Sequence, residues 1–245
     1  MMKPVRFVMS ALALAMAMPA FADDPAPAPA PADPLSFNVS LTTDYRYRGI
    51  SQTRLKPALQ GGADYAFDSG FYVGTWLSTI KWIKDAGGDA PVEWDIYGGY
   101  KTEIAKGISI DVGLLQYEYV NNKLHPSANT LEAYAAVTVG LVTAKYSAST
   151  TNLFGFADSK KSGYFDLSAA LDLGEGFTLT PHYGHQKVKN LSAASYSDYS
   201  LTLNKDMFGV TWGAAVVGTN AKGYYSPNGK DLGKTAAIIS VKKTF

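Results

Sequence analysis

Residues 37–48 read FNVSLTTDYRYR, and this stretch decides the fold class. Its odd-numbered positions from Phe37 to Tyr47 are apolar or aromatic apart from Thr43, while its even-numbered positions are polar or charged. Successive side chains of a β-strand point to opposite faces, so one face can contact an apolar medium and the other can contact water. We expect a strand that runs through Arg48 and separates these two environments.

Eleven further stretches repeat this alternation, and the connections between the stretches alternate in length. The short connections fall at residues 68–70, 105–107, 140, 174–176 and 205–206, and the long ones at 49–57, 81–91, 120–128, 150–161, 189–195 and 218–233. Outer-membrane barrels have short periplasmic turns and long extracellular loops. We therefore predict an all-β protein, a transmembrane up-and-down antiparallel β-barrel of about 12 strands over residues 36–245, with both termini in the periplasm.

Two segments before the barrel have the composition of export and spacer sequences. Residues 1–22 combine Lys3 and Arg6 with an apolar run and the motif Ala20-Phe21-Ala22, which predicts a secretory signal peptide. A membrane-anchor helix is the alternative, but the apolar run is too short to span a bilayer. Residues 23–35 are rich in Pro and Ala, which favours an extended periplasmic tether.

Composition excludes several other classes of protein. Without residues 1–22 the chain has 20 Lys+Arg against 21 Asp+Glu, so it lacks the basic surface of a nucleic-acid-binding protein. Cysteine is absent, which excludes a disulfide framework and a thiolate metal site. We expect no cofactor and no metal, and we expect barrel closure to stabilise the fold.

The position of the aromatic residues distinguishes a membrane barrel from a soluble sandwich, whose strands would alternate in the same way. Two bands of rings at the strand ends are the girdles of a membrane barrel. The band at the short turns is predicted to contain Phe37, Phe67, Phe71, Tyr100, Phe177, Phe208 and Phe245, and the band at the long loops Tyr45, Tyr47, Trp94 and Tyr119. Lys243 is the one charge on the apolar faces. These features predict the outer membrane of a Gram-negative cell, with its lipid as a partner.

The opposite faces of the strands predict a charged lumen. The predicted pore-lining residues are Asp44, Arg46, Arg48, Asp64, Glu93, Asp95, Asp111, Glu132, Lys145, Asp166, Asp172 and Lys242. Eight acids against four bases favour weakly cation-selective, passive diffusion of small solutes or ions. Arg46 and Arg48 are expected near the outer mouth, where they could form a local contact for anions.

Two alternatives to a channel stay open. A plugged structural barrel would use the inward aromatic residues Tyr72, Trp76, Tyr97, Tyr117, Tyr134 and Tyr164 to fill its interior. A barrel enzyme, such as a hydrolase, would need a catalytic base, and only His125, His182 and His185 are available. His182 and His185 differ in parity, so one should face the lumen and the other the outside. No local sequence prepares a Ser-His-Asp arrangement, and we expect no catalytic residue.

The chain resembles the TorF family of proteobacterial porins. The resemblance is carried by TTDYRYRGISQT (Thr42–Thr53), PALQGGADYAFDSGFYVGTW (Pro57–Trp76), VEWDIYGGY (Val92–Tyr100) and the terminal Phe245. It implies an outer-membrane, channel-like barrel without a defined solute. For such barrels generally, a terminal aromatic residue implies recognition by the outer-membrane assembly machinery, which makes Phe245 the expected assembly signal. Lys243 departs from the usual form of that signal.

Overall fold

The computed structural model describes residues 33–245. The predicted signal peptide and all but the last three residues of the predicted tether lie outside the described residues. Within the described part of the chain, no helix is long and apolar enough to cross a membrane.

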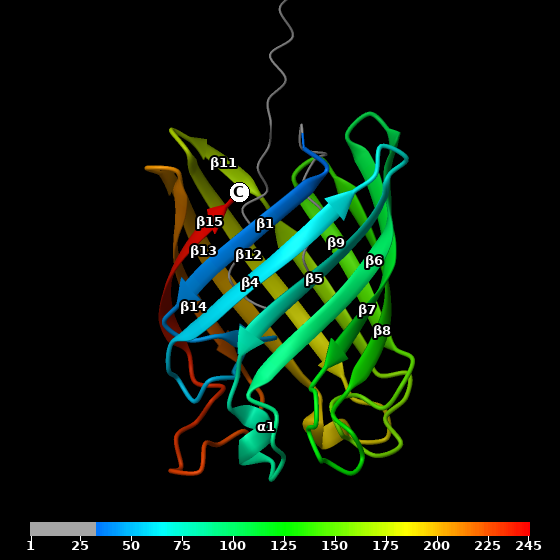
Figure 1. The fold of residues 1–245 in the computed structure, drawn as a ribbon, viewed down its shortest axis with the longest axis vertical. Coiled ribbons are helices and arrows are strands. Elements are labelled where there is room, and N and C mark those ends of the chain that lie inside the picture. Colours follow the sequence, from blue (N-terminus) through cyan, green and yellow to red (C-terminus); the bar gives the residue numbers. More distant parts are fainter. Residues whose placement is uncertain (1–32) are drawn as a thin grey trace, which may run out of the picture.

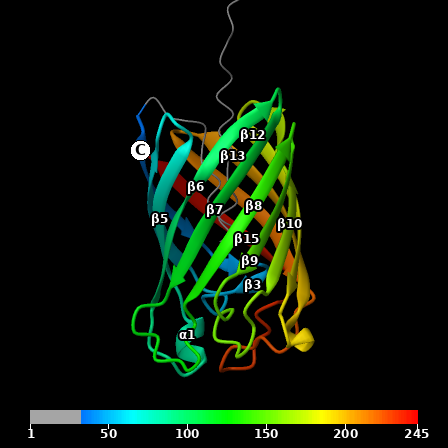
Figure 2. The same ribbon diagram turned by 90° about the vertical axis from the view of Figure 1, so that its right-hand side faces the viewer.

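The described chain forms a closed antiparallel β-barrel of twelve strands, as the alternating pattern predicts (Figures 1 and 2). Neighbours in sequence are neighbours in the barrel, and the wall closes where β1 pairs with β15. The elements in chain order are β1 (Leu35–Thr42), β2 (Arg46–Tyr47), β3 (Ile50–Ser51), β4 (Ala58–Ala66), β5 (Phe71–Thr79), α1 (Trp82–Asp85), β6 (Val92–Ala105), β7 (Ile108–Glu118), β8 (Thr130–Val139), β9 (Val142–Ser149), β10 (Gly163–Ala169), β11 (Leu171–Gly174), β12 (Phe177–Lys187), a 3-10 turn (Ser192–Ala194), β13 (Tyr196–Met207), β14 (Val210–Thr219) and β15 (Ala236–Thr244). β10 and β11 together make one of the twelve strands, whereas β2 and β3 form a separate two-stranded sheet.

The short turns gather at the end that holds the C-terminus, and α1 and the long loops gather at the other end (Figure 1). One predicted turn was wrong, because β13 and β14 continue past residues 205–206 until Met207 pairs with Val210. The turn is instead Phe208-Gly209, whose φ angles of 57° and 71° suit a two-residue hairpin. Phe208 is therefore a turn residue, 90% exposed, and not part of a strand face.

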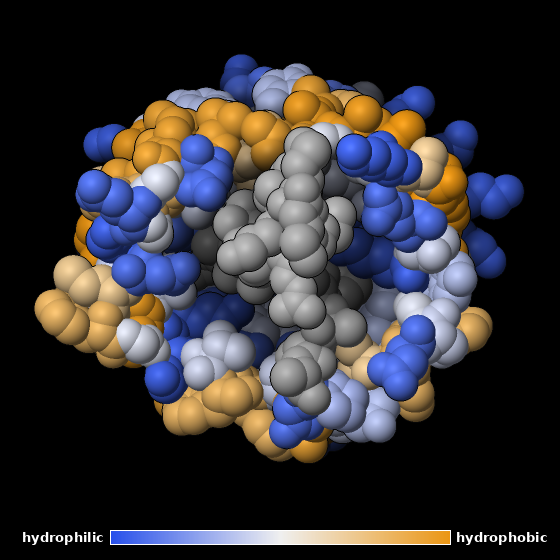
Figure 3. All heavy atoms as spheres, turned by 90° about the horizontal axis from the view of Figure 1, so that it is seen from above, coloured by the Kyte–Doolittle hydropathy of each residue, from blue (hydrophilic) through white to orange (hydrophobic). Residues whose placement is uncertain are grey.

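The outer wall is apolar, as a lipid-facing surface requires. Leu41, Leu59 and Leu114 are more than half exposed, and apolar residues gather along the circumference of the barrel seen from the short-turn end (Figure 3). The prediction for the aromatic band at the loop end was wrong for three residues, since Tyr45, Tyr47 and Tyr119 are buried. On the strands, the exposed aromatic residues near that end include Trp94, Tyr146, Phe165, Tyr183 and Tyr199.

A proline within a strand predicts a bulge or a local break, and Pro181 lies where the wall is interrupted. β12 pairs with β13 without interruption through Pro181 and Leu201. On its other side the partner strand is divided between β10, which ends at Ala169, and β11, which begins at Leu171. Proline has no amide hydrogen to donate to that neighbour, so the ladder is interrupted there.

Candidate functional site

The segment between β1 and β4, residues 43–57, contains a hairpin that folds inward. We call this segment the inner hairpin. The prediction that the first strand runs through Arg48 was wrong, because β1 ends at Thr42. Every residue from Asp44 to Thr53 is buried. The long connection 49–57 that was predicted to lie outside the barrel thus belongs to a segment that turns into it.

A two-residue turn reverses the inner hairpin. β2 and β3 pair Tyr47 with Ile50, and Arg48 and Gly49 between them have φ angles of 44° and 82°. Positive φ at both central residues is the requirement of a type I′ hairpin, in which glycine is common and arginine is not. The backbone strain at Arg48 persists because its side chain is held by several partners.

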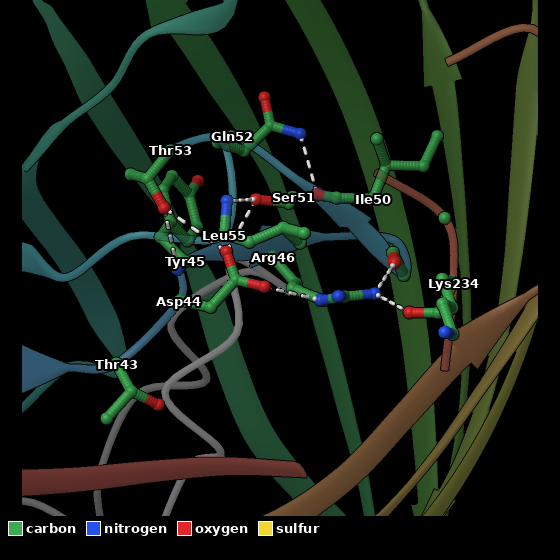
Figure 4. A network of polar contacts seen from close by, with 12 residues as sticks. Thr43, Asp44, Tyr45, Arg46, Ile50, Ser51, Gln52, Thr53, Leu55 and Lys234 are labelled. Atoms are coloured by element: carbon green, nitrogen blue, oxygen red, sulfur yellow. Dashed lines mark hydrogen bonds and ion pairs between the residues drawn. The ribbon is translucent and has the colours of Figure 1, made fainter. Parts of the chain in front are cut away.

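Asp44 and Arg46 fix the base of the inner hairpin (Figure 4). The Arg46 guanidinium donates to Asp44 Oδ2 at 2.8 Å, to the Gly49 carbonyl at 2.9 Å and to the Lys234 carbonyl at 2.8 Å. Asp44 also accepts from Ser51 Oγ at 2.5 Å. Because Lys234 precedes β15, these contacts join the inner hairpin to the last strand of the barrel.

Arg48, at the tip of the inner hairpin, contacts the opposite wall of the barrel. Its Nη2 lies 2.8 Å from Glu132 Oε2 of β8, and its Nη1 donates to Glu132 Oε1 and to Gln186 of β12. The guanidinium carbon stacks 4.0 Å above the centre of the Tyr164 ring and 4.7 Å from that of Tyr47. A buried charge needs this combination of an opposite charge and further contacts, because its desolvation is costly.

The two tyrosines of the inner hairpin bind the wall formed by β6 and β7. The Tyr45 hydroxyl donates to Glu93 Oε1 at 2.6 Å, and Tyr119 donates to the other oxygen of Glu93 at 2.9 Å. The Tyr47 hydroxyl donates to that of Tyr117 at 3.1 Å. Together with Ile80 and other buried side chains these rings form the largest apolar cluster of the described residues. The loop end of the lumen is therefore narrowed by packed side chains.

Tyrosines carried by the strands lie over glycines of the inner wall. A Cβ atom added to Gly74 would overlap the Tyr97 ring, one added to Gly99 would overlap Tyr72, and one on Gly184 would overlap Tyr164. Gly113 and Tyr134 make a fourth pair. Glycine within a strand permits the bends of a closed wall, and the structure gives these glycines a second role as positions over which aromatic rings lie. Each ring seated on a glycine therefore lies against a neighbouring strand, and all four rings are buried.

The predicted pore-lining residues have different surroundings, which the alternation of the sequence could not distinguish. Asp44, Arg46, Arg48 and Glu132 are buried ion pairs of the inner hairpin and do not line an open mouth. Among the others, Asp64 accepts from Tyr97, Asp111 from Tyr72, and Glu93 from Tyr45 and Tyr119. Asp166 contacts His182, and Lys145 lies over the Tyr134 ring. Asp95 is buried, Lys242 is half-buried, and the exposed Asp172 accepts from the Gly174 amide near a turn.

Two charged residues absent from the predicted pore-lining set, Asp198 and Lys101, extend this inner surface together with His182. Asp198 is 2% exposed and accepts from the Tyr164 hydroxyl at 3.2 Å. His182 lies between two carboxylates: its Nε2 is 2.5 Å from Asp166 Oδ2, and its Nδ1 is 3.7 Å from Asp198 Oδ1. The register places Lys101 opposite Asp111. Asp198 and Lys101 could have been found, because both have inward parity on strands whose outward residues were identified.

The histidines give little support to a catalytic site. His182 faces inward and His185 is exposed, which confirms the predicted difference in parity. His185 Nδ1 lies 2.9 Å from Ser197 Oγ on the outer face. Within residues 33–245 no carboxylate pairs with His185, so this pair lacks the third group that orients a catalytic base. In the same residues no three His, Cys, Asp or Glu side chains converge as a metal site.

The closed wall, the apolar outer surface and the polar interior define an outer-membrane β-barrel. The chain belongs to the family described as "Bacterial protein of unknown function (Gcw_chp)", whose model matches residues 26–245. No curated protein matches the sequence.

Solved outer-membrane barrels share the fold at low sequence identity. The KdgM porin has a TM-score of 0.56 at 9% identity, with 86% of this chain and 99% of that chain covered. The NanC porin has a TM-score of 0.55 at 11% identity, covering 86% and 98%. The COG4313 outer membrane channel from Pseudomonas putida F1 has a TM-score of 0.53 at 13% identity, covering 91% and 99%. At these identities the similarity extends to the fold alone.

Proposed function

We propose that the protein is an outer-membrane channel of the porin type, through which small solutes or ions diffuse passively, and that the inner hairpin is its constriction. The observation that carries this proposal is the seating of Tyr72, Tyr97, Tyr134 and Tyr164 over glycines of a neighbouring strand, which keeps these buried rings close to the inner wall. The likeness to barrels named as porins and channels supports the same class of function. We retain the TorF porins as the group that the segments from Thr42 to Tyr100 resemble.

The proposed selectivity is a weak preference for cations. Arg46 and Arg48 are neutralised by Asp44 and Glu132, and among the other predicted lumenal residues acids outnumber Lys145 and Lys242. Carboxylates in a low-dielectric wall concentrate cations. Screening at physiological salt, where the Debye length is about 8 Å, keeps the preference modest.

A plugged structural barrel is the second candidate, and the continuous burial of residues 44–53 favours it. Planar-bilayer recordings of the refolded protein separate the two functions. Discrete conductance steps support the channel, and a silent bilayer supports the plugged barrel. Lipid or peptide hydrolysis by a protein that is silent in the bilayer would instead identify a barrel enzyme.

Phe245 remains the proposed signal for the assembly machinery. Its backbone exchanges two hydrogen bonds with Phe37, of 2.8 and 3.2 Å, and its side chain is 69% exposed. Deleting Phe245 should lower the amount of heat-modifiable barrel in the outer membrane. Unchanged assembly would show that another feature of the last strand is recognised.

A further inference from the structure

A basic cleft lies on the extracellular side of the barrel, where three segments of the chain meet. Arg54 and Lys56 of the inner hairpin, Lys81 before α1 and Lys230 of the last loop line it, and its volume is about 380 Å³. None of these residues lies in a strand. We call these four residues and the space between them the basic cleft.

Backbone hydrogen bonds hold the three segments together. The Lys81 amide donates to the Gln52 carbonyl at 2.8 Å, which joins the approach to α1 to the inner hairpin. The Ser51 amide donates to the Leu232 carbonyl at 3.0 Å, which joins the inner hairpin to the last loop. The cleft is therefore formed by the fold itself, and a ligand need not order it.

The charge of the basic cleft is unbalanced. Asp85 accepts from Arg54 Nε at 2.7 Å and so neutralises one of the four cations. Among residues 33–245, no carboxylate pairs with Lys56, Lys81 or Lys230. Asp231 follows Lys230, but its carboxylate accepts from the Gly233 amide at 2.9 Å. Three ammonium groups thus remain available for an anion.

The height of the basic cleft on the barrel indicates which anion it meets. Pro57 and Thr79 also line the cleft, and each is two residues from a lipid-facing leucine. These leucines, Leu59 and Leu77, are 58% and 44% exposed. Two residues of a strand span about 7 Å, so the cleft lies directly above the apolar belt, at the level of the lipid headgroups.

We propose that the basic cleft binds a phosphate group of an outer-leaflet lipid. Lysine ammonium groups bind phosphate as strong, charge-assisted donors, and basic pockets beside the apolar belt of a membrane protein bind lipid headgroups. A lipid held there by its phosphate would place its acyl chains against Leu59 and Leu77. This site is separate from the lumen and is independent of whether the barrel conducts.

The test compares lipid binding by the full chain and by two charge-matched variants. Lys56→Gln, Lys81→Gln and Lys230→Gln together empty the basic cleft of its unpaired cations. Lys160→Gln, Lys189→Gln and Lys222→Gln remove the same charge from exposed positions on extracellular loops outside the cleft. Binding of bisphosphorylated lipid A in detergent micelles is measured by native mass spectrometry, with dephosphorylated lipid A and inorganic phosphate as further probes.

We expect the cleft variant to bind lipid A at least about tenfold more weakly, and the control variant to bind it like the original protein. Dephosphorylated lipid A should bind the original protein as weakly as lipid A binds the cleft variant. Equal losses in both variants would contradict the proposal, because they would indicate a general effect of net charge. Inorganic phosphate that binds the original protein as tightly as lipid A does would also overturn the proposal, because the site would then be one for soluble anions.

Discussion

The protein uses tyrosine in two ways inside one barrel. At the loop end, Tyr45 and Tyr47 come from the inner hairpin and pack across the lumen against Glu93 and Tyr117. Further along the wall, Tyr97 and similar residues come from the strands and lie over glycines. The same side chain therefore packs across the lumen where an inserted segment carries it, and lies against the wall where a neighbouring strand supplies a glycine, although both kinds join one buried cluster.

We expect the largest effect on the free energy of unfolding, and it comes from removing the acid that pairs with Arg48 at the tip of the inner hairpin. Glu132→Gln leaves the buried guanidinium without its paired carboxylate, and breaking a buried ion pair on one side typically costs about 3 to 5 kcal/mol. The free energy of unfolding in urea should fall accordingly. The double variant Arg48→Gln with Glu132→Gln should lose less, since it buries no unpaired charge. Equal losses in the single and double variants would contradict a desolvated ion pair.

The region in which tyrosines lie over glycines is tested by adding a methyl group to one of these glycines. Gly74→Ala would push its methyl group into Tyr97 and Asp64, and overpacking of this kind costs about 1 to 3 kcal/mol. In a Tyr97→Leu background the same change should cost clearly less, which a double-mutant cycle of unfolding free energies measures. Additive costs would show that Tyr97 does not occupy the space above Gly74.

The two arginines give a smaller effect, on ion selectivity. Arg46→Gln with Arg48→Gln removes two bases whose partners Asp44 and Glu132 stay behind, so cation preference should increase. Reversal potentials under a KCl gradient measure the change. A clear anion preference of the original protein that this variant abolishes would show instead that the arginines control the constriction.

The smallest effect concerns pH and the loops outside the membrane. The hydrogen bond from Lys123 at 2.9 Å, aided by Lys84, lowers the pKa of Asp89 below its usual value. A lowered pKa in the folded state means that the contact contributes at neutral pH and is lost as pH falls through that lowered value. Protease cleavage within residues 86–91 should rise slightly at acidic pH, and Asp89→Asn should show the higher rate already at neutral pH.

The alternating pattern predicted the wall of the barrel because period-two alternation is a property of each strand and needs no distant contacts. It could not predict the inner hairpin, since Asp44, Arg46 and Arg48 keep the alternation of the strand that precedes them. Their inward course depends on Glu132, Gln186 and the Lys234 carbonyl, which are distant in sequence. The contacts between tyrosines and glycines could not be predicted for the same reason, because each joins a glycine to a tyrosine of a different strand.

Two local features of the sequence mark departures from a plain wall. Pro181 indicated the irregularity that divides β10 from β11, since the missing amide hydrogen is a local property. Arg48-Gly49 could have been read as a turn, because a glycine after a run of alternating residues is typical of a tight hairpin. The regular parity of residues 37–48 outweighed that signal.

Single-channel conductance with and without the inner hairpin tests the central claim most directly. Replacing residues 43–57 by a four-residue Gly-Ser linker leaves β1 and β4 joined by an ordinary hairpin loop, and shortening residues 189–195 provides the control. The account predicts discrete steps for the original protein, steps several-fold larger for the variant without the inner hairpin, and no change for the control. Equal conductance with and without the inner hairpin would contradict it.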